Sequence, residues 1–269
     1  MDLHLRDQVA VVFGGASGIG LACAEELARA GCRIALCDVS RATEEAALKL
    51  RRECQVPVIA LNVDVSHQDQ VETAVDQLEA ELGPAQILVH AAAVGSGKFG
   101  FPFTNLTPKD WPRVLEINIL GMVNVAHVIG PRMIAHGRGS MAFVSSVAGQ
   151  IGSQTDPPYS ASKAANINFA QCLAKDLAPH GIRVNTVCPG MVQTPLNRSV
   201  WQAWNDQQTP DNRRSYEDWA NEKVRNVIPL RRWQKPEDIA NLITFLSSDR
   251  ASEITGQTIN VDGGFVMHW

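Results

Sequence analysis

The sequence predicts an α/β fold, in which helices flank both faces of a doubly wound parallel sheet of seven strands. Short apolar runs alternate with amphipathic segments, which is the pattern of repeated β-α units. A chain of 269 residues without repeats or low-complexity linkers fits one large domain, so residues 1–269 are assigned to a single domain. The runs expected to form strands are 8–15, 33–39, 58–65, 85–93, 140–149, 182–190 and 258–264.

Helical patterns separate these runs. Residues 19–31 have helical spacing with Gly31 as the stop, and the helix over 68–83 begins after Ser66 and ends at Gly83. One polar segment, 196–229, interrupts the alternation and carries three tryptophans. We expect a substrate lid at about 191–229.

Composition narrows the function classes. The apolar fraction of 45% and the charged fraction of 19% are those of an ordinary globular protein. A net charge of −4, with Lys and Arg scattered along the chain, argues against nucleic acid or a membrane as the main partner. The charged N-terminus does not read as a secretory signal, and no run of 18 apolar residues appears. These features predict a cytoplasmic protein with a small-molecule substrate.

Cysteine and histidine spacing gives no sign of a metal site. The six cysteines contain no CxxC pair and are expected to be reduced core residues. The seven histidines contain no HxxxH pair, and no metal is expected.

A glycine loop, Gly14 to Gly20, follows the first strand and opens a helix. Glycines let the backbone approach a pyrophosphate, and the helix N-terminus supplies free N–H groups. A tight turn without a ligand is the alternative. Asp38 comes 18 residues after Gly20, where its carboxylate would accept hydrogen bonds from a ribose and repel a ribose phosphate. This favours NAD over NADP, although the nearby Arg33 and Arg41 speak for the phosphate of NADP. The alternative role for Asp38 is a helix cap or a surface charge.

The stretch YSASK places Tyr159 four residues before Lys163. On a helix the two side chains leave the same face about one turn apart, so a phenol and an ammonium can act on one atom. An exposed surface pair is the alternative.

With these motifs in view, the chain resembles the classical short-chain dehydrogenase/reductase family over nearly its whole length. The parts fall in the family's order: GGASGIG at 14–20, Asp38, VDV at 63–65, Asn118 in EINILG, Ser146 in VSSVAG, YSASK at 159–163 and CPGMVQT at 188–194. The resemblance implies a Rossmann fold and an NAD-dependent oxidoreductase that interconverts a secondary alcohol and a ketone, or a sugar hemiacetal and a lactone.

The resemblance also assigns catalytic roles. Tyr159 would exchange the proton with the substrate, and Lys163 would favour the phenolate and hydrogen-bond the nicotinamide ribose. Ser146, chosen over Ser145 on the family spacing, would hold the substrate oxygen, and Asn118 would anchor a water in a proton relay. The cofactor-binding residues that the resemblance implies are Gly14, Ser17, Gly18, Ile19, Gly20, Asp38, Asp64, Val65, Ala92, Lys163, Pro189, Gly190, Val192 and Thr194.

Two positions depart from the family pattern. Phe13 stands where the family usually has Thr, and HAAA at 90–93 replaces an Asn-Asn-Ala-Gly stretch. We interpret both as local repacking that leaves the chemistry intact but alters the ribose contacts. His90 is expected to be a buried, hydrogen-bonded strand residue, with a catalytic role as the alternative.

Substrate recognition is expected in three loops, 94–103, 149–158 and 191–229. Polar side chains there favour a polyol, a sugar or a sugar acid, and a hydrophobic cyclic or aryl alcohol or ketone is the alternative. Tryptophans that only pack the lid are the structural alternative. The candidate substrate residues are Lys98, Gln154, Asp156 and Trp201.

Two further expectations concern assembly and activity. A homotetramer is expected, because several segments resemble the interfaces of tetrameric family members. These segments are the final strand, the tail with Trp269, and the helices that carry INILG and YSASK. A sensor that binds NAD without turnover is the alternative of another class, and intact Tyr159, Lys163, Ser146 and Asn118 argue against it. An acyl-carrier-type ketoreductase would favour NADP and a basic docking patch.

Overall fold

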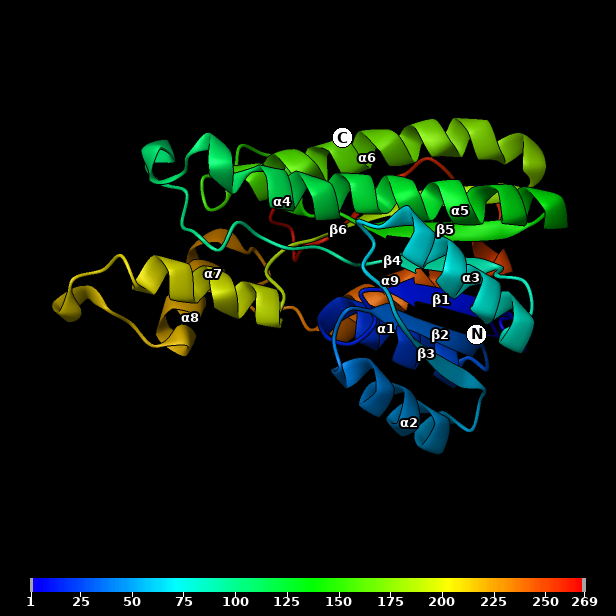
Figure 1. The fold of residues 1–269 in the computed structure, drawn as a ribbon. Helices are drawn as coiled ribbons and strands as arrows, with labels where there is room; N and C mark the ends of the chain where they lie inside the picture. Colours follow the sequence, from blue (N-terminus) through cyan, green and yellow to red (C-terminus); the bar gives the residue numbers. More distant parts are fainter. Residues whose placement is uncertain (1, 268–269) are drawn as a thin grey trace.

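A sheet of seven parallel strands forms the centre of the computed structural model, which describes residues 2–267 (Figure 1). The strand order is β3-β2-β1-β4-β5-β6-β7, so the predicted doubly wound fold is confirmed. The order reverses between β1 and β4, where open α/β sheets bind ligands at the carboxyl ends of their strands. The strands are β1 (Val9–Phe13), β2 (Arg33–Asp38), β3 (Val58–Asn62), β4 (Ile87–His90), β5 (Gly139–Val144), β6 (Ile182–Pro189) and β7 (Thr258–Val261).

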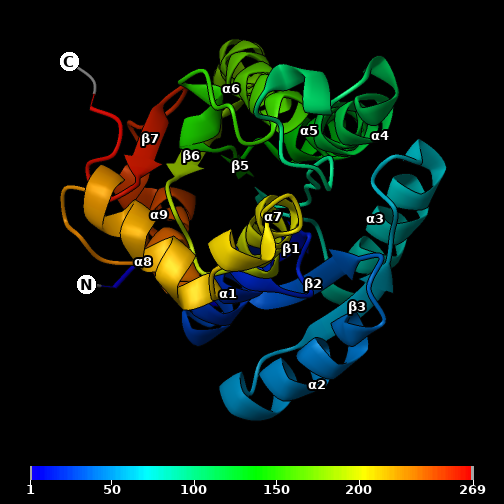
Figure 2. The ribbon, with the colours of Figure 1, turned by 90° about the vertical axis from the view of Figure 1, so that its left-hand side faces the viewer.

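Helices cover both faces of the sheet (Figure 2). Side chains of α3, α5 and α6 pack on one face, and those of α1, α2 and α9 pack on the other. Successive side chains of β1 point to opposite faces of the sheet. Val9, Val11 and Phe13 therefore belong to the hydrophobic core on the α3, α5 and α6 side, whereas Ala10 and Val12 belong to the core on the other side. The helices are α1 (Gly18–Arg29), α2 (Ala42–Cys54), α3 (Gln68–Leu82), α4 (Pro112–Leu115), α5 (Gly121–His136), α6 (Pro157–Leu177), α7 (Pro195–Asn205), α8 (Tyr216–Val227) and α9 (Pro236–Ser247).

The strands end earlier than the apolar runs predict. β5 stops at Val144, so Ser145 and Ser146 lie beyond the strand, and β3 stops before Asp64. Single backbone hydrogen bonds continue just past some strand ends, as from the Ser145 N–H to the Val187 carbonyl at 2.8 Å, before the chain turns away. The residues beyond the strands form the loops at the carboxyl edge of the sheet, where side chains from separate strands meet.

Helix α6 begins with a strong local signal. The Asp156 carboxylate accepts a hydrogen bond from the N–H of Tyr159 at 3.4 Å, and Pro157 occupies the first helical turn. This cap fixes where the helix begins, and it therefore fixes the directions in which Tyr159 and Lys163 project.

The 191–229 segment contains two helices, α7 and α8, in front of the sheet (Figure 2). Thr194 caps α7 and Ser215 caps α8, each with its side-chain oxygen. Aromatic rings join the helices: Trp201 meets Tyr216 edge-on at 5.8 Å, and Trp204 lies 6.3 Å from Trp219. The segment therefore carries a small aromatic cluster of its own.

Two other expectations meet the structure here. The helical run Pro108–His136 has the length and hydropathy of a membrane span, but 56% of its most apolar window is buried inside the fold, as in a core helix. The expectation of six core cysteines was partly wrong. Cys172 is exposed on α6, and Cys54 is half-buried at the end of α2, where it packs against the edge of the core. The other four are buried, and all six are free thiols.

Candidate active site

The glycine loop lies against the end of β4 and needs its glycines. A Cβ on Gly14 would lie 2.5 Å from the backbone nitrogen of Ala92, and one on Gly20 would lie 2.1 Å from the Gly14 carbonyl oxygen. Ser17 precedes α1 with extended backbone and does not cap it through its side chain. The first N–H groups of α1, from Gly18 and Ile19 onward, are therefore left without that cap. An uncapped N-terminus beside backbone that no Cβ can approach fits a pyrophosphate.

Asp38 lies beside this loop. Its Oδ2 accepts a hydrogen bond from the Ala16 N–H, and its Oδ1 accepts one from the Ser40 N–H, both at 3.0 Å. The carboxylate is thus held by backbone donors at the end of β2. Arg33 begins the same strand at its far end and donates to the Leu82 carbonyl, so of the two arginines named above only Arg41 follows Asp38 at this end of β2.

The adenine-side residues follow β3. The Asp64 carboxylate accepts from the N–H and hydroxyl of Ser66, at 2.9 and 2.6 Å. Burial raises the pKa of Asp64, but these hydrogen bonds and Arg113 outweigh burial and hold the pKa below its ordinary value. Val65 is buried, and Gly121 packs so closely against it that a Cβ there would lie 2.5 Å from its methyl carbon. A charged carboxylate next to an apolar wall is therefore preformed.

Residues after β6 cross the same edge of the sheet. Pro189 ends the strand, and a Cβ on Gly190 would lie 2.6 Å from Gln234 Oε1. Val192 forms an isolated bridge with Gln234. Farther on, Thr194 reaches the glycine loop, since a Cβ on Gly18 would lie 3.5 Å from the Thr194 methyl. This stretch thus connects the end of β6 to the start of both α1 and α7.

Tyr159 and Lys163 share one face of α6, as their spacing predicts. Lys163 Nζ lies 5.4 Å from the centroid of the Tyr159 ring and donates to the Val144 carbonyl at 2.8 Å. The lysine is only 2% exposed, and burial lowers its pKa to about 8. Burial raises the pKa of Tyr159, while the hydrogen bond with Ser146 acts in the opposite direction. The phenol is therefore protonated in the unliganded protein.

The two serines after β5 have different roles. The Ser145 hydroxyl donates to the Lys163 carbonyl at 2.7 Å and is buried. The Ser146 hydroxyl accepts a hydrogen bond from the Ala148 N–H at 3.1 Å, so its own proton is free to be donated. The side chain of Tyr159 lies next to it, within hydrogen-bonding reach. The geometry thus distinguishes Ser145, which braces α6, from Ser146, which lies beside the phenol and is the serine that the family spacing favours.

Asn118 lies in a π-helical turn, Glu116–Leu120, between α4 and α5. Its Oδ1 accepts from the Val94 N–H at 2.8 Å, and its Nδ2 donates to the Val94 carbonyl at 2.9 Å and to Ser162 Oγ at 3.0 Å. Both amide hydrogens are used, so a relay water would be bound by its remaining oxygen lone pairs. π turns often occur at functional sites, but nothing in the sequence signals this one.

His90 differs from its expectation in one respect. It is 4% exposed and lies edge-on between Phe13 and Phe143, with ring centroids 6.3 and 6.0 Å away. Its Nδ1 has no hydrogen-bond partner, so the expected hydrogen-bonded histidine was wrong. The parallel register sets Phe13, His90 and Phe143 side by side, so the two neighbouring strands present apolar rings to the imidazole. Burial and the nearby Lys163 lower its pKa to about 3, so the imidazole is neutral.

The candidate substrate residues already have protein partners, except Gln154, which is exposed. Lys98 Nζ forms an ion pair with Asp110 at 2.8 Å, and its hydrogen bond lowers the pKa of Asp110 to about 2. The buried Asp156 carboxylate accepts from the Ser96 N–H at 2.7 Å, in addition to capping α6. Trp201 donates its indole N–H to the Arg214 carbonyl at 3.1 Å. Asp156 thereby ties the 94–103 loop to the catalytic helix.

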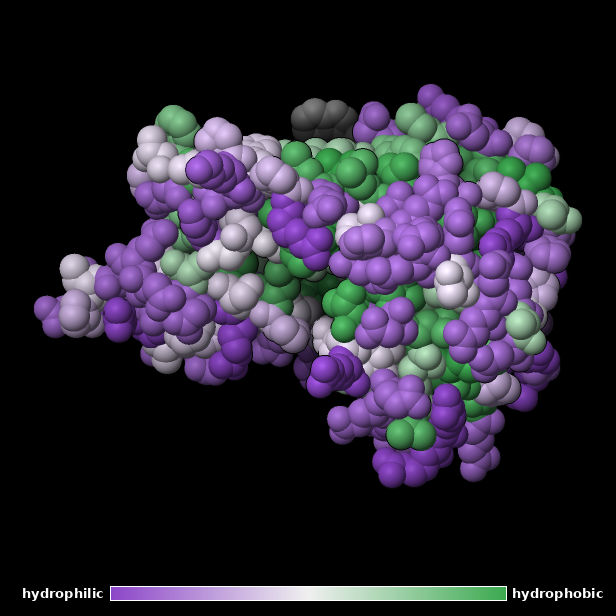
Figure 3. All heavy atoms as spheres, viewed as in Figure 1, coloured by the Kyte–Doolittle hydropathy of each residue, from purple (hydrophilic) through white to green (hydrophobic). Residues whose placement is uncertain are grey.

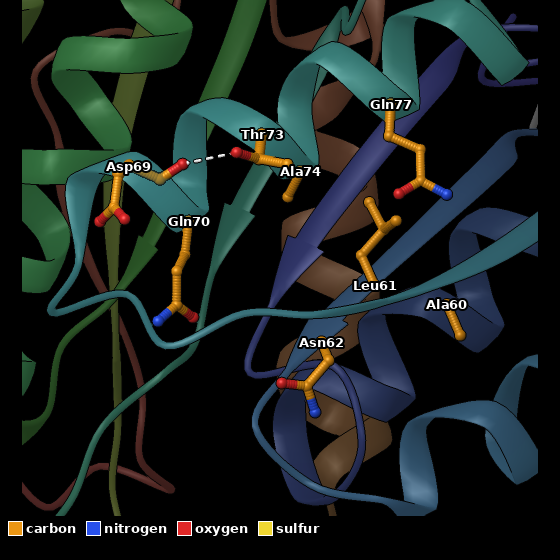
Figure 4. A pocket seen from close by; sticks show the side chains of 8 residues that line it. All are labelled: Ala60, Leu61, Asn62, Asp69, Gln70, Thr73, Ala74 and Gln77. Atoms are coloured by element: carbon orange, nitrogen blue, oxygen red, sulfur yellow. Dashed lines mark hydrogen bonds between the residues drawn. The ribbon is translucent and has the colours of Figure 1, made fainter.

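Surface shape agrees with this location. Figure 3 shows a hollow with apolar walls between the projecting 191–229 segment and the body of the protein. A separate polar pocket of about 340 Å³ lies between the edge strand β3 and α3, away from the tetrad of Asn118, Ser146, Tyr159 and Lys163 (Figure 4). One of its wall residues, Gln70, accepts a hydrogen bond from the N–H of Asp64, a residue predicted to contact adenine. Within residues 2–267 no group of His, Cys, Asp and Glu has a metal-binding arrangement.

Sequence reasoning missed three contributors to the site. Ser145 donates a hydrogen bond to the backbone of α6, and Ser162 accepts one from Asn118. The Ser96 N–H donates to the Asp156 carboxylate. The serine of YSASK at position 162 carries a signal in hindsight, because it projects from α6 three residues after Tyr159. Ser145 and Ser96 have partners in distant segments of the chain, so no local sequence signal marks them.

Comparison with known proteins agrees with the geometry. The chain matches the family model described as enoyl-(acyl carrier protein) reductase over residues 14–266. It is 32% identical to 3-oxoacyl-[acyl-carrier-protein] reductase of Thermotoga maritima, over 98% of this chain and 100% of the relative. It is 31% identical to NAD-dependent glycerol dehydrogenase of Listeria innocua, over 99% of this chain and 96% of the relative.

A solved structure is equally similar. The crystal structure of L-sorbose reductase from Gluconobacter frateurii, complexed with NADPH and L-sorbose, superposes with a TM-score of 0.90 at 31% identity and covers 100% of both chains. Because sequence and structure match family members from end to end, the chain belongs to the classical short-chain dehydrogenase/reductase family of oxidoreductases.

Proposed function

We propose that this protein is an NAD-dependent oxidoreductase that interconverts a secondary alcohol and a ketone, or a sugar hemiacetal and a lactone, on a polyol, a sugar or a sugar acid. The observation that carries the cofactor choice is the Asp38 carboxylate at the end of β2, beside the glycine loop. A ribose phosphate at this position would face a negative charge, whereas ribose hydroxyls would find an acceptor. The L-sorbose reductase structure contains NADPH, so this choice distinguishes our proposal from that relative.

The residues of the site can hold the cofactor and move one proton. Gly14, Gly20 and the first turn of α1 would bind the pyrophosphate, Asp38 the adenosine ribose, and Lys163 the nicotinamide ribose. When bound, NAD supplies the acceptor for hydride from the alcohol carbon. Ser146 orients the substrate oxygen toward Tyr159, and the phenolate takes the alcohol proton in oxidation. In reduction the phenol returns it. The Lys163 charge favours the phenolate.

The substrate class rests on the three loops around the hollow. Gln154 is exposed on one of them, and Lys98, Asp156 and Trp201 would share or exchange their protein partners with the substrate. A polyhydroxylated substrate would exchange hydrogen bonds with such groups, and a missing hydroxyl would leave them unpaired. The glycerol dehydrogenase and L-sorbose reductase relatives act on compounds of this kind by name. A hydrophobic cyclic or aryl alcohol is the second candidate, favoured by the apolar walls of the hollow (Figure 3).

The test is NADH formation, followed by absorbance, with NAD and NADP compared across polyols, aldoses, sugar acids and apolar secondary alcohols. Acetoacetyl thioesters are included in the reductive direction, with Tyr159→Phe as the control. We expect turnover with NAD on polyhydroxylated compounds, abolished in the control. Turnover confined to apolar alcohols or to thioesters would overturn the substrate class. NAD binding without turnover of any compound would indicate that the protein is an NAD-binding sensor and not an enzyme.

We also propose a homotetramer in the cytoplasm. Leu120, in the helical stretch that carries Asn118, is 55% exposed and Ile134 on α5 is 37% exposed, as an interface on these helices would require. Trp269, the other interface residue expected from the sequence, lies outside the described residues. Sedimentation at micromolar concentration is expected to give a tetramer, and a stable monomer would contradict this.

A further inference from the structure

Gln150 and Asn260 form a reciprocal amide pair across 110 residues of sequence. Gln150 Nε2 donates to Asn260 Oδ1 at 2.8 Å, and Asn260 Nδ2 donates to Gln150 Oε1 at 3.0 Å. Because each side chain gives and receives one hydrogen bond, the pair fixes the distance and the orientation of both backbones. Both residues are half-buried, at the carboxyl edge of the sheet.

Gln150 ends the turn that carries Ser146. Ser146 caps the short 3-10 helix Val147–Gly149, and the Gln150 N–H donates back to the Val147 carbonyl at 2.9 Å. The turn is packed closely on the catalytic helix, since a Cβ on Gly149 would lie 2.6 Å from the carbonyl carbon of Lys163. A displacement of Gln150 would therefore move the turn that orients Ser146 toward Tyr159.

Asn260 belongs to a C-terminal segment that reaches the 191–229 segment. Its Nδ2 also donates to the Val266 carbonyl at 3.0 Å, and the buried Asp262 carboxylate accepts from the Gly264 and Val266 N–H groups at 2.9 and 2.7 Å. These bonds fold residues 260–266 into a compact turn. The Leu230 N–H then donates to the Gly263 carbonyl at 3.1 Å, directly after the 191–229 segment ends.

We propose that Gln150 and Asn260 are positioning residues, which hold the Ser146 turn in register with the C-terminal segment and with the end of the 191–229 segment. The pair links the turn that orients the substrate oxygen to the segment that covers the substrate. Its amide groups are engaged with each other. The kinetic consequence rests on the proposed alcohol–ketone function, and the structural consequence does not.

The test uses the full-length protein with Gln150→Ala, Asn260→Ala, the double alanine variant and the exchanged pair Gln150→Asn with Asn260→Gln. Hydrogen exchange of the N–H groups at 147–151 is measured first, because it needs no substrate. We expect faster exchange in each single variant and native-like exchange in the exchanged pair. The matched control is Gln77→Ala, whose amide donates to Glu81 on the exposed side of α3.

Kinetics follow on the substrate identified by NADH formation. Each single variant is expected to lower kcat about tenfold, the value of one or two lost hydrogen bonds, with the KM for NAD unchanged. The double variant should lose no more than a single one, because the two side chains act as one pair. Unchanged exchange at 147–151, additive losses, or an equal rise in the KM for NAD would each overturn the proposal. Absence of turnover in the wild type refutes the proposed function, while the exchange data still decide the positioning role.

Discussion

The catalytic tetrad and the 191–229 segment are built in opposite ways. Asn118 and Lys163 are at most 2% exposed, and backbone groups of neighbouring strands and loops hold their side chains. Helix α7 has no buried residue, and the buried residues of α8, Trp219, Ala220 and Val224, belong to neither of the two main core clusters. Aromatic pairs and partly exposed hydrogen bonds join the two helices. The proton chemistry that we propose would therefore lie on rigid strand ends, and the proposed recognition on a segment with little share in the main core, which can change without disturbing the fold.

The largest effect is expected at the centre of the tetrad. Tyr159→Phe removes the proton donor and acceptor and keeps the ring in its place, so turnover should fall about 10²- to 10⁴-fold. NAD binding, measured by fluorescence quenching, should stay within about twofold. Retained turnover would show that another group moves the proton and would break the assignment of chemistry to α6.

The burial of Lys163 predicts a pH dependence of stability. Its pKa is about 8 in the folded protein and 10.5 in its ordinary state. Between these values the unfolded chain binds the additional proton, so the free energy of unfolding contributed by this group rises with pH, by about 3 kcal/mol in total. Denaturant unfolding of the wild type and of Lys163→Met at pH 7 to 11 isolates this contribution from those of tyrosines and cysteines. A constant difference between the two proteins would contradict it.

The glycine loop gives the next effect. Gly20→Ala places a Cβ against the Gly14 carbonyl, and the loop must shift. Overpacking of this kind costs about 1–3 kcal/mol, so the Kd for NAD should rise about 10- to 100-fold. Gly130→Ala on α5, where a Cβ meets open space, is the matched control. Equal loss of NAD binding in both variants would point to general destabilisation.

Asp38 decides between the two cofactors. Asp38→Ser should lower kcat/KM for NAD about tenfold, because a charged acceptor is lost, and should raise kcat/KM for NADP. The ratio of the two values in the same preparation is the measurement. An unchanged ratio would mean that Asp38 serves only the backbone of the glycine loop.

The smallest effect is expected in the 191–229 segment. Trp201→Phe removes the hydrogen bond to Arg214 and keeps an aromatic ring next to Tyr216. The KM for the substrate should change about fivefold at most, and the KM for NAD should not change. A comparable change in the KM for NAD would show that recognition and cofactor binding are less separate than the packing indicates.

What the sequence predicted follows the same division. Alternating apolar runs and the glycine loop are local signals, so the seven strands of a doubly wound parallel sheet could be predicted from the sequence, and the structure confirms them. The π turn at Asn118 and the Gln150–Asn260 pair depend on contacts between distant segments, which no local spacing encodes. His90 was assigned its burial correctly but not its missing partner, because the neighbouring strands β1 and β5 set its surroundings.

The contact between Thr194 and Gly18 has a consequence for the kinetic cycle. One short stretch of chain borders the pyrophosphate loop on one side and begins the 191–229 segment on the other. If α7 moves to admit substrate, as the proposed function requires, the movement would reach the glycine loop through Thr194. A bound dinucleotide would in turn hold the chain around Thr194 in position. We therefore expect a compulsory order, in which the dinucleotide binds before the substrate and dissociates after the product. Product inhibition patterns would report this order directly.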